Sequence, residues 1–175
     1  LIHALTSMLR ISLNKGDDIL TVSQELDHAK AYMDIQEIRY EGLFEYTVSC
    51  TDDAGGCKIM KLLLQPIVEN SIKYGFAGLE TGGQIHIGVT RDSGRIRFVV
   101  ENNGASIDLQ KAELLNRIKK MDEASIRASV FTESGGFGIY NIVSRLKIKY
   151  GEAFDIHYSL PKTGGTQCVI QVPVE

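Results

Sequence analysis

Two alternating runs joined by a short turn, at residues 84–102, constrain the fold of this chain most strongly. The apolar positions of each run fall on one face: Ile85, Ile87 and Val89 in QIHIGVTRD, and Ile96, Phe98 and Val100 in RIRFVVEN. A period of two is typical of a strand that buries one face, and the DSG between the runs is typical of a hairpin turn. The sequence therefore predicts an antiparallel hairpin whose apolar face needs a second layer to cover it.

Strand-like and helical segments interleave along the rest of the chain. Further strands are predicted at 44–50, 154–160 and 166–174, and helices at 1–13, 21–40, 58–75 and 139–150. Pro66 lacks an amide donor, so it marks either the start of a helix or a kink within 58–75. Because the strands are joined largely by hairpins, we expect an α+β fold rather than a doubly wound one. The predicted architecture is a two-layer sandwich of a mixed sheet with helices on one face, preceded by an N-terminal helical segment.

The predicted division of the chain is a helical segment at 1–43 followed by an α+β domain at 44–175. In the first helix, apolar residues recur at spacings of three and four, at Ile2, Leu5, Leu9 and Leu13. Thr21 and Gln24 have the spacing of a capping box at the start of the second helix. The apolar stripe either packs on its own domain or meets a partner helix.

Composition and charge narrow the class of function. A net charge of −3 over 175 residues leaves no broad basic face, so we expect no nucleic-acid partner. No apolar run approaches the roughly 18 residues that span a bilayer, so this segment is not expected to lie in the membrane. Cys50 and Cys57 flank a turn-like TDDAGG and could meet across a hairpin, but the odd number of cysteines, with Cys168, favours a reducing cytoplasm. Leu1 in place of methionine indicates a fragment.

Three glycines in four residues open the last predicted helix, in GGFGIYNIVSRL from Gly135 to Leu146. The cluster fits neither a Rossmann loop, which follows a buried strand directly, nor a Walker loop, which ends in Gly-Lys-Ser/Thr. Glycines permit a close approach to the backbone, and a helix N-terminus presents free amides to an anion. The pattern therefore indicates either an anion site or a flexible hinge before a helix.

Three other clusters carry polar side chains. Asn70 and Lys73 in VENSIKYG share a helical face. Either the Asn70 amide oxygen binds magnesium and the Lys73 ammonium contacts phosphate, or both side chains are simply solvated. The predicted strand in VVENNGASI ends in two asparagines and a glycine. These residues either hydrogen-bond the edge of a nucleotide base or form an Asx turn. Gly165 and Thr166 open the last strand, and on their own they indicate only a hairpin turn.

The order of these clusters resembles the ATP-binding domain of sensor histidine kinases. That order is Asn-x-x-Lys on a helix, a strand ending in Asn-Asn-Gly, a long polar segment at 105–135, Gly-x-Gly-x-x-Asn opening a helix, and Gly-Thr before the last strand. The stretches LLLQPIVENSIKYG and GFGIYNIVSRLKIKYG resemble the LytS/YehU-like subgroup more closely. SMLRISL and DIQEIRY resemble the region after its phosphoacceptor motif, so the resemblance covers residues 1–175.

The resemblance implies how the phosphate end of an ATP molecule would be held. Asn70 would bind the magnesium ion. Lys73 would contact phosphate and stabilise the transferred phosphoryl group. Gly136 and Gly138 would cradle the phosphates at the N-terminus of the helix that carries Asn141.

The resemblance also implies how the adenine end would be held. Asn102 stands where the family has an aspartate that accepts from the adenine amine, so the corresponding bond here lacks charge assistance. Gly104 would let adenine approach, and Thr166 would lie near the base. Ser106 replaces the second glycine of the family's first glycine motif. Residues 105–135 would form a lid that closes over the triphosphate.

The function that the resemblance implies is the catalytic step of a two-component system. The chain would bind Mg-ATP and transfer the γ-phosphate to a histidine upstream of this fragment, and the phosphoryl group would then pass to an aspartate of a response regulator. The full-length protein would be a homodimer through its N-terminal helices and anchored in the cell membrane, with this part in the cytoplasm. The chain's own histidines do not match the phosphoacceptor motif and are predicted to be structural: His3, His28, His86 and His157.

Two other functions remain open at this point. Asn102 and Ser106 are compatible with a degenerate module that binds nucleotide weakly or docks partners, without phosphoryl transfer. A related ATPase would need a general base for water, and Glu69 is the carboxylate beside the proposed magnesium site.

Overall fold

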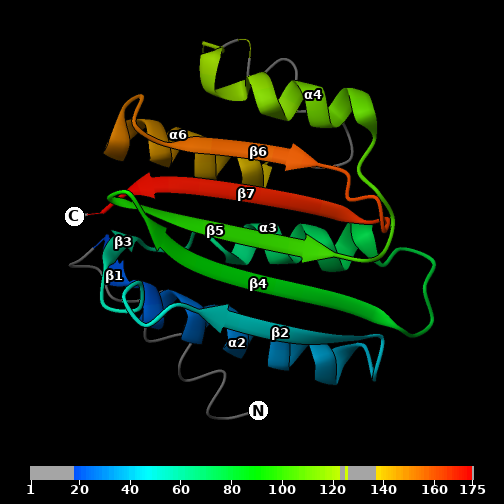
Figure 1. Cartoon of the computed structure of the whole chain (residues 1–175). Coiled ribbons are helices and arrows are strands. Elements are labelled where there is room, and N and C mark those ends of the chain that lie inside the picture. The colour runs from blue at the N-terminus through cyan, green and yellow to red at the C-terminus, as the bar shows by residue number, and fades with distance from the viewer. Residues whose placement is uncertain (1–17, 123–124, 126–136, 175) are drawn as a thin grey trace.

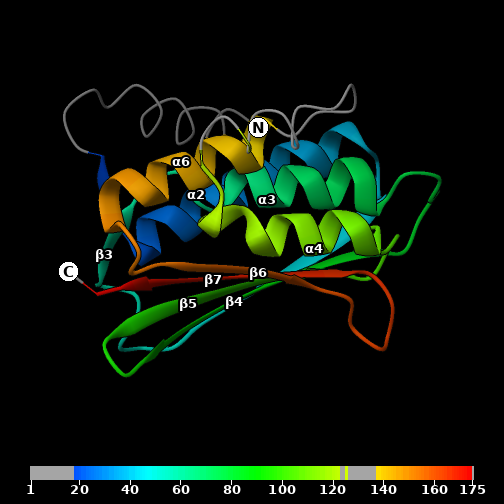
Figure 2. The same ribbon diagram turned by 90° about the horizontal axis from the view of Figure 1, so that it is seen from above.

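The computed structural model describes residues 18–122, 125 and 137–174, so the predicted helix at 1–13 lies outside the described residues. The described chain forms two layers, a twisted sheet and a set of helices that covers one of its faces (Figures 1 and 2). The other face of the sheet carries no helix in the described part of the chain (Figure 2). The predicted α+β sandwich is therefore confirmed.

The main sheet is mixed, as predicted. Its strand order is β2 (Phe44–Cys50), β4 (Gly83–Asp92), β5 (Arg95–Asn102), β7 (Thr166–Pro173) and β6 (Asp155–Ser159). The predicted hairpin is β4 and β5, which pair antiparallel with Asp92 opposite Arg95. β2 and β4 pair in parallel, whereas β5–β7 and β7–β6 are antiparallel. The apolar residues of each strand point toward the helices, as the period-two pattern requires.

The helical layer lies behind the sheet in Figure 1. Its elements are α2 (Val22–Arg39), α3 (Gln65–Asn70), the π-helical η1 (Ser71–Gly75), α4 (Leu109–Arg117), the 3₁₀-helical η2 (Ile118–Lys120) and α6 (Phe137–Tyr150). α3 runs directly into η1, so the two form one helix whose turn widens at Ser71. The core lies between the layers, where Phe44, Phe98 and Phe154 are almost completely buried. No helix of the described part of the chain combines the length and the apolar character needed to cross a membrane.

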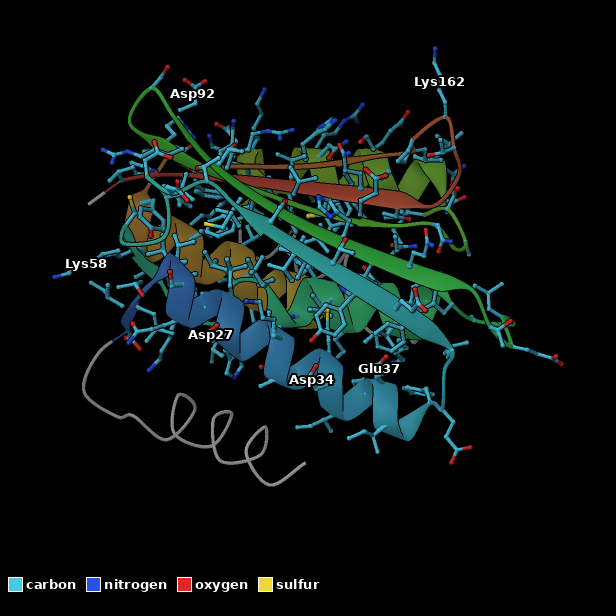
Figure 3. All side chains as sticks on the ribbon, turned by 60° about the horizontal axis from the view of Figure 1, so that its bottom comes forward. Asp27, Asp34, Glu37, Lys58, Asp92 and Lys162 are labelled. Atoms are coloured by element: carbon cyan, nitrogen blue, oxygen red, sulfur yellow. The ribbon has the colours of Figure 1, made fainter. Side chains whose placement is uncertain are left out.

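The predicted capping box starts α2. The Gln24 amide N–H donates to Thr21 Oγ1 at 3.2 Å, and the Thr21 N–H donates to Gln24 Oε1 at 2.9 Å. Three exposed acidic residues follow one another along this helix, at Asp27, Asp34 and Glu37 (Figure 3). Asp34 accepts a hydrogen bond from the Tyr46 hydroxyl, which ties α2 to β2.

The prediction of one helix over 58–75 is wrong in its first half. Lys58–Met60 form strand β3, which pairs antiparallel with β1 (Ile19–Thr21), and the helix begins at Gln65 with Pro66 in its first turn. Pro66 therefore marks a helix start and not a kink. The suggested hairpin between Cys50 and Cys57 does not form either, because β2 pairs with β4, and both thiols are free.

His28 gives stability a predicted pH dependence. Its side chain in α2 is fully buried, and neither ring nitrogen has a hydrogen-bond partner in the described structure. Burial lowers the pKa of His28 below 6.5. Because the folded pKa lies below the unfolded one, this contribution to stability is fully present above about pH 6.5 and is lost as the pH falls.

We therefore expect the free energy of unfolding to fall from pH 7.5 to pH 5.5, with a slope of at most about 1.4 kcal/mol per pH unit from this group. Denaturant unfolding at several pH values would measure the slope. His28→Leu should flatten it, whereas replacing the exposed His157 by glutamine should leave it as in the wild type. An identical slope in wild type and His28→Leu would contradict this assignment.

Candidate functional site

A cavity of about 770 Å³ lies between the sheet and the helical layer. β5, β6 and β7 form its floor, α3 and η1 form one wall, and the segment from Ala105 to Leu115 forms another. The start of α6 contributes Gly138 and Ile139 to the lining. Several predicted site residues line this one cavity: Asn70, Lys73, Asn102, Gly138 and Thr166.

The floor of the cavity is built by strand register. Asn102 on β5 lies opposite Thr166 on β7, and Cys168 lies opposite both Val100 and Tyr158 on the two neighbouring strands. Burial raises the pKa of the Tyr158 phenol well above its usual value, and it raises the pKa of the Cys168 thiol to about 12. Both groups are neutral at pH 7, so the floor is uncharged. Such a surface suits an uncharged part of a ligand.

Asn102 is the most informative polar residue of the floor. The side chain is 3% exposed, and its Nδ2 has no hydrogen-bond partner among the described residues. A buried amide donor without a partner costs about 1–3 kcal/mol, so this N–H group calls for an acceptor such as a ring nitrogen of a bound base or a water. A Cβ on Gly75 would lie 2.5 Å from Nδ2, so glycine at the end of η1 leaves the room that this amide occupies.

Gly104 has a different local role from the one that the resemblance implies. The Ala105 N–H donates to the Gly75 carbonyl, and a Cβ on Gly104 would lie 1.9 Å from that same oxygen. Gly104 therefore allows two backbone segments to approach, while its neighbours Ala105 and Ser106 line the cavity. Contact between Gly104 and adenine stays a prediction.

Thr166 ties the segment after β5 to the start of β7. Its Oγ1 accepts a hydrogen bond from the Ile107 N–H at 2.8 Å. The preceding Gly165 has a φ of +84°, and a Cβ there would lie 1.7 Å from the Asn102 carbonyl oxygen. Thr166 thus fixes Ile107, a cavity residue that the sequence did not single out.

Asn70 and Lys73 stand on the wall opposite the strands. Asn70 is half-buried at the end of α3, and Lys73 is exposed on η1. π-helical turns are rare and occur frequently at functional sites. Lys73 Nζ lies 5.0 Å from the centroid of the Tyr74 ring, and Lys111 Nζ from α4 lies 5.2 Å from the same centroid. Two ammonium groups beside one ring make this side of the cavity favourable for an anion.

The start of α6 meets the start of α3. A Cβ on Gly138 would lie 3.3 Å from Pro66 Cβ, so a side chain here would crowd the cavity wall. Asn141 is exposed and is not among the lining residues. Gly136 lies outside the described residues, so the proposed phosphate contacts of Gly136 and Asn141 stay predictions.

The described part of the predicted lid packs on the sheet. α4 and η2 bury Ala112, Leu115 and Ile118, and Asn116 exchanges two hydrogen bonds with the backbone of Tyr158, at 2.6 and 2.9 Å. Lys119 pairs with Asp155 at 3.1 Å. These contacts hold the first half of residues 105–135 in place, whereas 123–124 and 126–135 lie outside the described residues.

Some cavity residues were not predicted, and the reasons differ. Tyr158 reads as an ordinary core position of a strand, because nothing local shows that its neighbour across the sheet is Cys168. Tyr74 follows Lys73 directly, but the sequence does not show that Lys111 from α4 also comes close to its ring. Among the described residues, no three His, Cys, Asp or Glu side chains gather as a metal site.

Two family models match the chain. The model described as histidine kinase-, DNA gyrase B-, and HSP90-like ATPase matches residues 34–175, and the model described as histidine kinase matches residues 1–44. The sensor histidine kinase YesM of Bacillus subtilis is 30% identical over 173 residues, 99% of this chain and 27% of its own length. The sensor histidine kinase/phosphatase LytS of Staphylococcus aureus is 29% identical over 154 residues, 86% of this chain and 25% of its own. The chain thus spans about a quarter of these curated relatives.

Solved structures share the fold. The nucleotide-free catalytic domain of the histidine kinase ThkA superposes with a TM-score of 0.64 at 16% identity, covering 89% of this chain and 94% of that domain. The mycobacterial sensor histidine kinase MprB gives a TM-score of 0.61 at 19% identity over 91% of this chain and 99% of that one. ThkA in complex with response regulator protein TrrA gives 0.59 at 14% identity over 99% of this chain and 48% of that one.

Proposed function

Because this chain belongs to the family of histidine kinase-, DNA gyrase B- and HSP90-like ATPases, we propose that it is the ATP-binding catalytic part of a two-component sensor histidine kinase. One observation carries the proposal. A single cavity brings the Asn102 amide on an uncharged floor together with Asn70 and Lys73 on the facing wall. An amide can accept from the adenine amine, and the wall is suited to a metal-bound triphosphate.

The phosphate end of the nucleotide would be held by the helical layer. Mg²⁺ keeps several waters and takes one or two protein oxygens together with phosphate oxygens, so the Asn70 amide oxygen is a sufficient protein ligand. Lys73 would neutralise the charge on the transferred group. Gly136 and Gly138 would cradle phosphates at the start of α6, with Asn141 on the same helix.

The reaction is a phosphoryl transfer. The bond between the γ-phosphorus and the β,γ-bridging oxygen breaks, a bond from that phosphorus to a histidine ring nitrogen forms, and ADP leaves with the bridging oxygen. The phosphoryl group then moves from nitrogen to a carboxylate oxygen of a response-regulator aspartate. Since the protein carries out little covalent chemistry in such a step, the contributions of Lys73 and Asn70 are positioning and charge neutralisation.

The acceptor histidine of this reaction lies upstream of the chain. His28 is buried, and the His86 Nδ1 shares a hydrogen bond with Thr47 Oγ1 at 2.9 Å on the exposed face of the sheet. His157 stands on that same face, away from the cavity, and His3 lies outside the described residues. We also propose that the full-length protein forms a homodimer through its N-terminal helices and carries a membrane anchor.

Labelling with γ-³²P-ATP tests the function. This chain alone should acquire no acid-labile phosphate, whereas a longer protein with the upstream region should become labelled and pass the label to its response regulator. Label on this chain would contradict the upstream acceptor. A longer protein that binds ATP but stays unlabelled would favour the degenerate module, for which Asn102 and Ser106 are the sequence arguments.

Asn102 provides a separate prediction about the base. Asn102→Asp should tighten ATP binding about fivefold, because a hydrogen bond to a charged acceptor is worth about 1 kcal/mol more than one to a neutral acceptor. Calorimetric titration with ATP would measure the change in affinity. GTP is the control, because its 6-carbonyl cannot donate a hydrogen bond and its affinity should not rise. An unchanged or weaker ATP affinity would mean that Asn102 does not face the adenine amine.

A further inference from the structure

Residues 61–64, the turn that leads into α3, are held from one side by α2. The Glu25 carboxylate accepts three backbone hydrogen bonds, from the N–H groups of Leu62 at 2.8 Å, Leu63 at 2.7 Å and Leu64 at 2.9 Å. Glu25 is fully buried although it carries an ionisable group. Burial raises the pKa of Glu25, while the three donors and the nearby Arg145 charge oppose that shift. Such a carboxylate is retained only where its hydrogen bonds are complete.

The same turn is also held by α6. The Arg145 guanidinium donates to the carbonyl oxygens of Lys61 at 2.6 Å and Leu62 at 3.4 Å. Between these two anchors, Leu62 has a φ of +59°, a left-handed conformation that costs a branched residue free energy. Two helices that are far apart in the sequence therefore impose one strained conformation on the turn.

The position of this turn sets the position of the phosphate-side wall. Leu64 is the N-cap of α3, and Pro66 in its first turn packs against Gly138 at the start of α6. Asn70 ends the same short helix, about 9 Å further along its axis. A helix of six residues moves as a unit, so a shift at residues 62–64 reaches Asn70 and Lys73.

We propose that Glu25 is a positioning residue for the magnesium–triphosphate end of the site, acting through the N–H groups of residues 62–64. The proposal rests on the proposed ATP-binding function and adds one step to it. The placement of α2, through Glu25, fixes where Asn70 and Lys73 stand. The floor of the cavity, with Asn102 and Thr166, belongs to the sheet and is held by the pairing of β5 with β7.

A split between two ligands tests the proposal. Glu25→Gln replaces one acceptor oxygen by an amide donor that faces backbone donors. It should weaken binding of the Mg²⁺ complex of a non-hydrolysable ATP analogue by about 10-fold or more, because Asn70 and Lys73 are displaced together with residues 62–64. Adenosine, which lacks phosphates and uses only the floor, should bind within about twofold of wild type. Glu37→Gln makes the same chemical change at an exposed position of α2 and should alter neither affinity (Figure 3).

Each other outcome has a distinct meaning. Equal losses of affinity for both ligands would overturn the proposal, because Glu25 would then support the whole cavity. Unchanged affinity for the Mg²⁺ complex would overturn it as well. If Glu25→Gln does not fold, Glu25→Asp, which withdraws the carboxylate by about 1.5 Å, must show the same split. A wild-type chain that binds neither ligand would refute the proposed function instead.

Discussion

Replacing Gly104 by alanine is expected to destabilise the protein severely and to abolish nucleotide binding. The new Cβ would lie 1.9 Å from the Gly75 carbonyl oxygen, 2.7 Å from its carbon and 2.9 Å from Phe76 Cδ1. Two of these atoms are backbone, so no rotamer change relieves the clash, and the hydrogen bond from Ala105 to Gly75 must break. Because η1 carries Lys73, the cavity wall has to move with it.

We expect a cost of about 3 kcal/mol or more, which for a chain of this length corresponds to a fall of roughly 6–12 °C in the thermal midpoint. Gly56→Ala is a matched control, because a Cβ there meets no atom within 4 Å. Its effect should stay within about 0.5 kcal/mol. If Gly104→Ala and Gly56→Ala have the same thermal midpoint, the close contact between Gly104 and Gly75 is not present in solution.

The second large effect is expected from Asn70→Ala. This change should remove the magnesium-dependent part of nucleotide affinity, a loss of about 100-fold or ~2.7 kcal/mol, while the thermal midpoint of the ligand-free protein hardly changes. The side chain is half-buried at the end of α3 and lines the cavity, so its loss leaves no void in the core. Calorimetry with and without Mg²⁺ separates the two quantities.

The neighbouring Glu69 supplies the control for Asn70→Ala. Glu69 is exposed and also lines the cavity, and Glu69→Gln should keep the magnesium-dependent affinity. A large fall in the stability of Asn70→Ala with intact Mg²⁺ dependence would make Asn70 a structural residue. Loss of Mg²⁺ dependence in Glu69→Gln alone would instead assign the metal to Glu69 and contradict the role of Asn70.

Local patterns predicted those parts of the fold whose partners are close in sequence. The hairpin of β4 and β5 and the capping box of Thr21 and Gln24 are both confirmed, because each is encoded within a few residues. The apolar run at 58–64 was misassigned, since a short run of this kind does not distinguish a helix from a buried strand. Its strand character comes from pairing with β1, about forty residues earlier.

The candidate site was predictable as a set of residue types but not as a set of contacts. Asn70, Lys73, Asn102, Gly138 and Thr166 converge on one cavity, as the order of the motifs implied. The reasons for Gly75 and Gly104 are visible only in the packed structure, where their backbones touch. Glu25 gave no local signal either, because its three donors lie nearly forty residues away and a glutamate early in a helix is typical of exposed positions.

Titration of this chain with a non-hydrolysable ATP analogue, with and without Mg²⁺, tests the central claim most directly. We predict that one nucleotide binds per chain in the presence of Mg²⁺, that affinity falls markedly when the ion is chelated, and that adenosine competes for the same site. No binding of the Mg²⁺ complex at millimolar concentration would contradict the account, and the cavity would then belong to a module that does not use ATP.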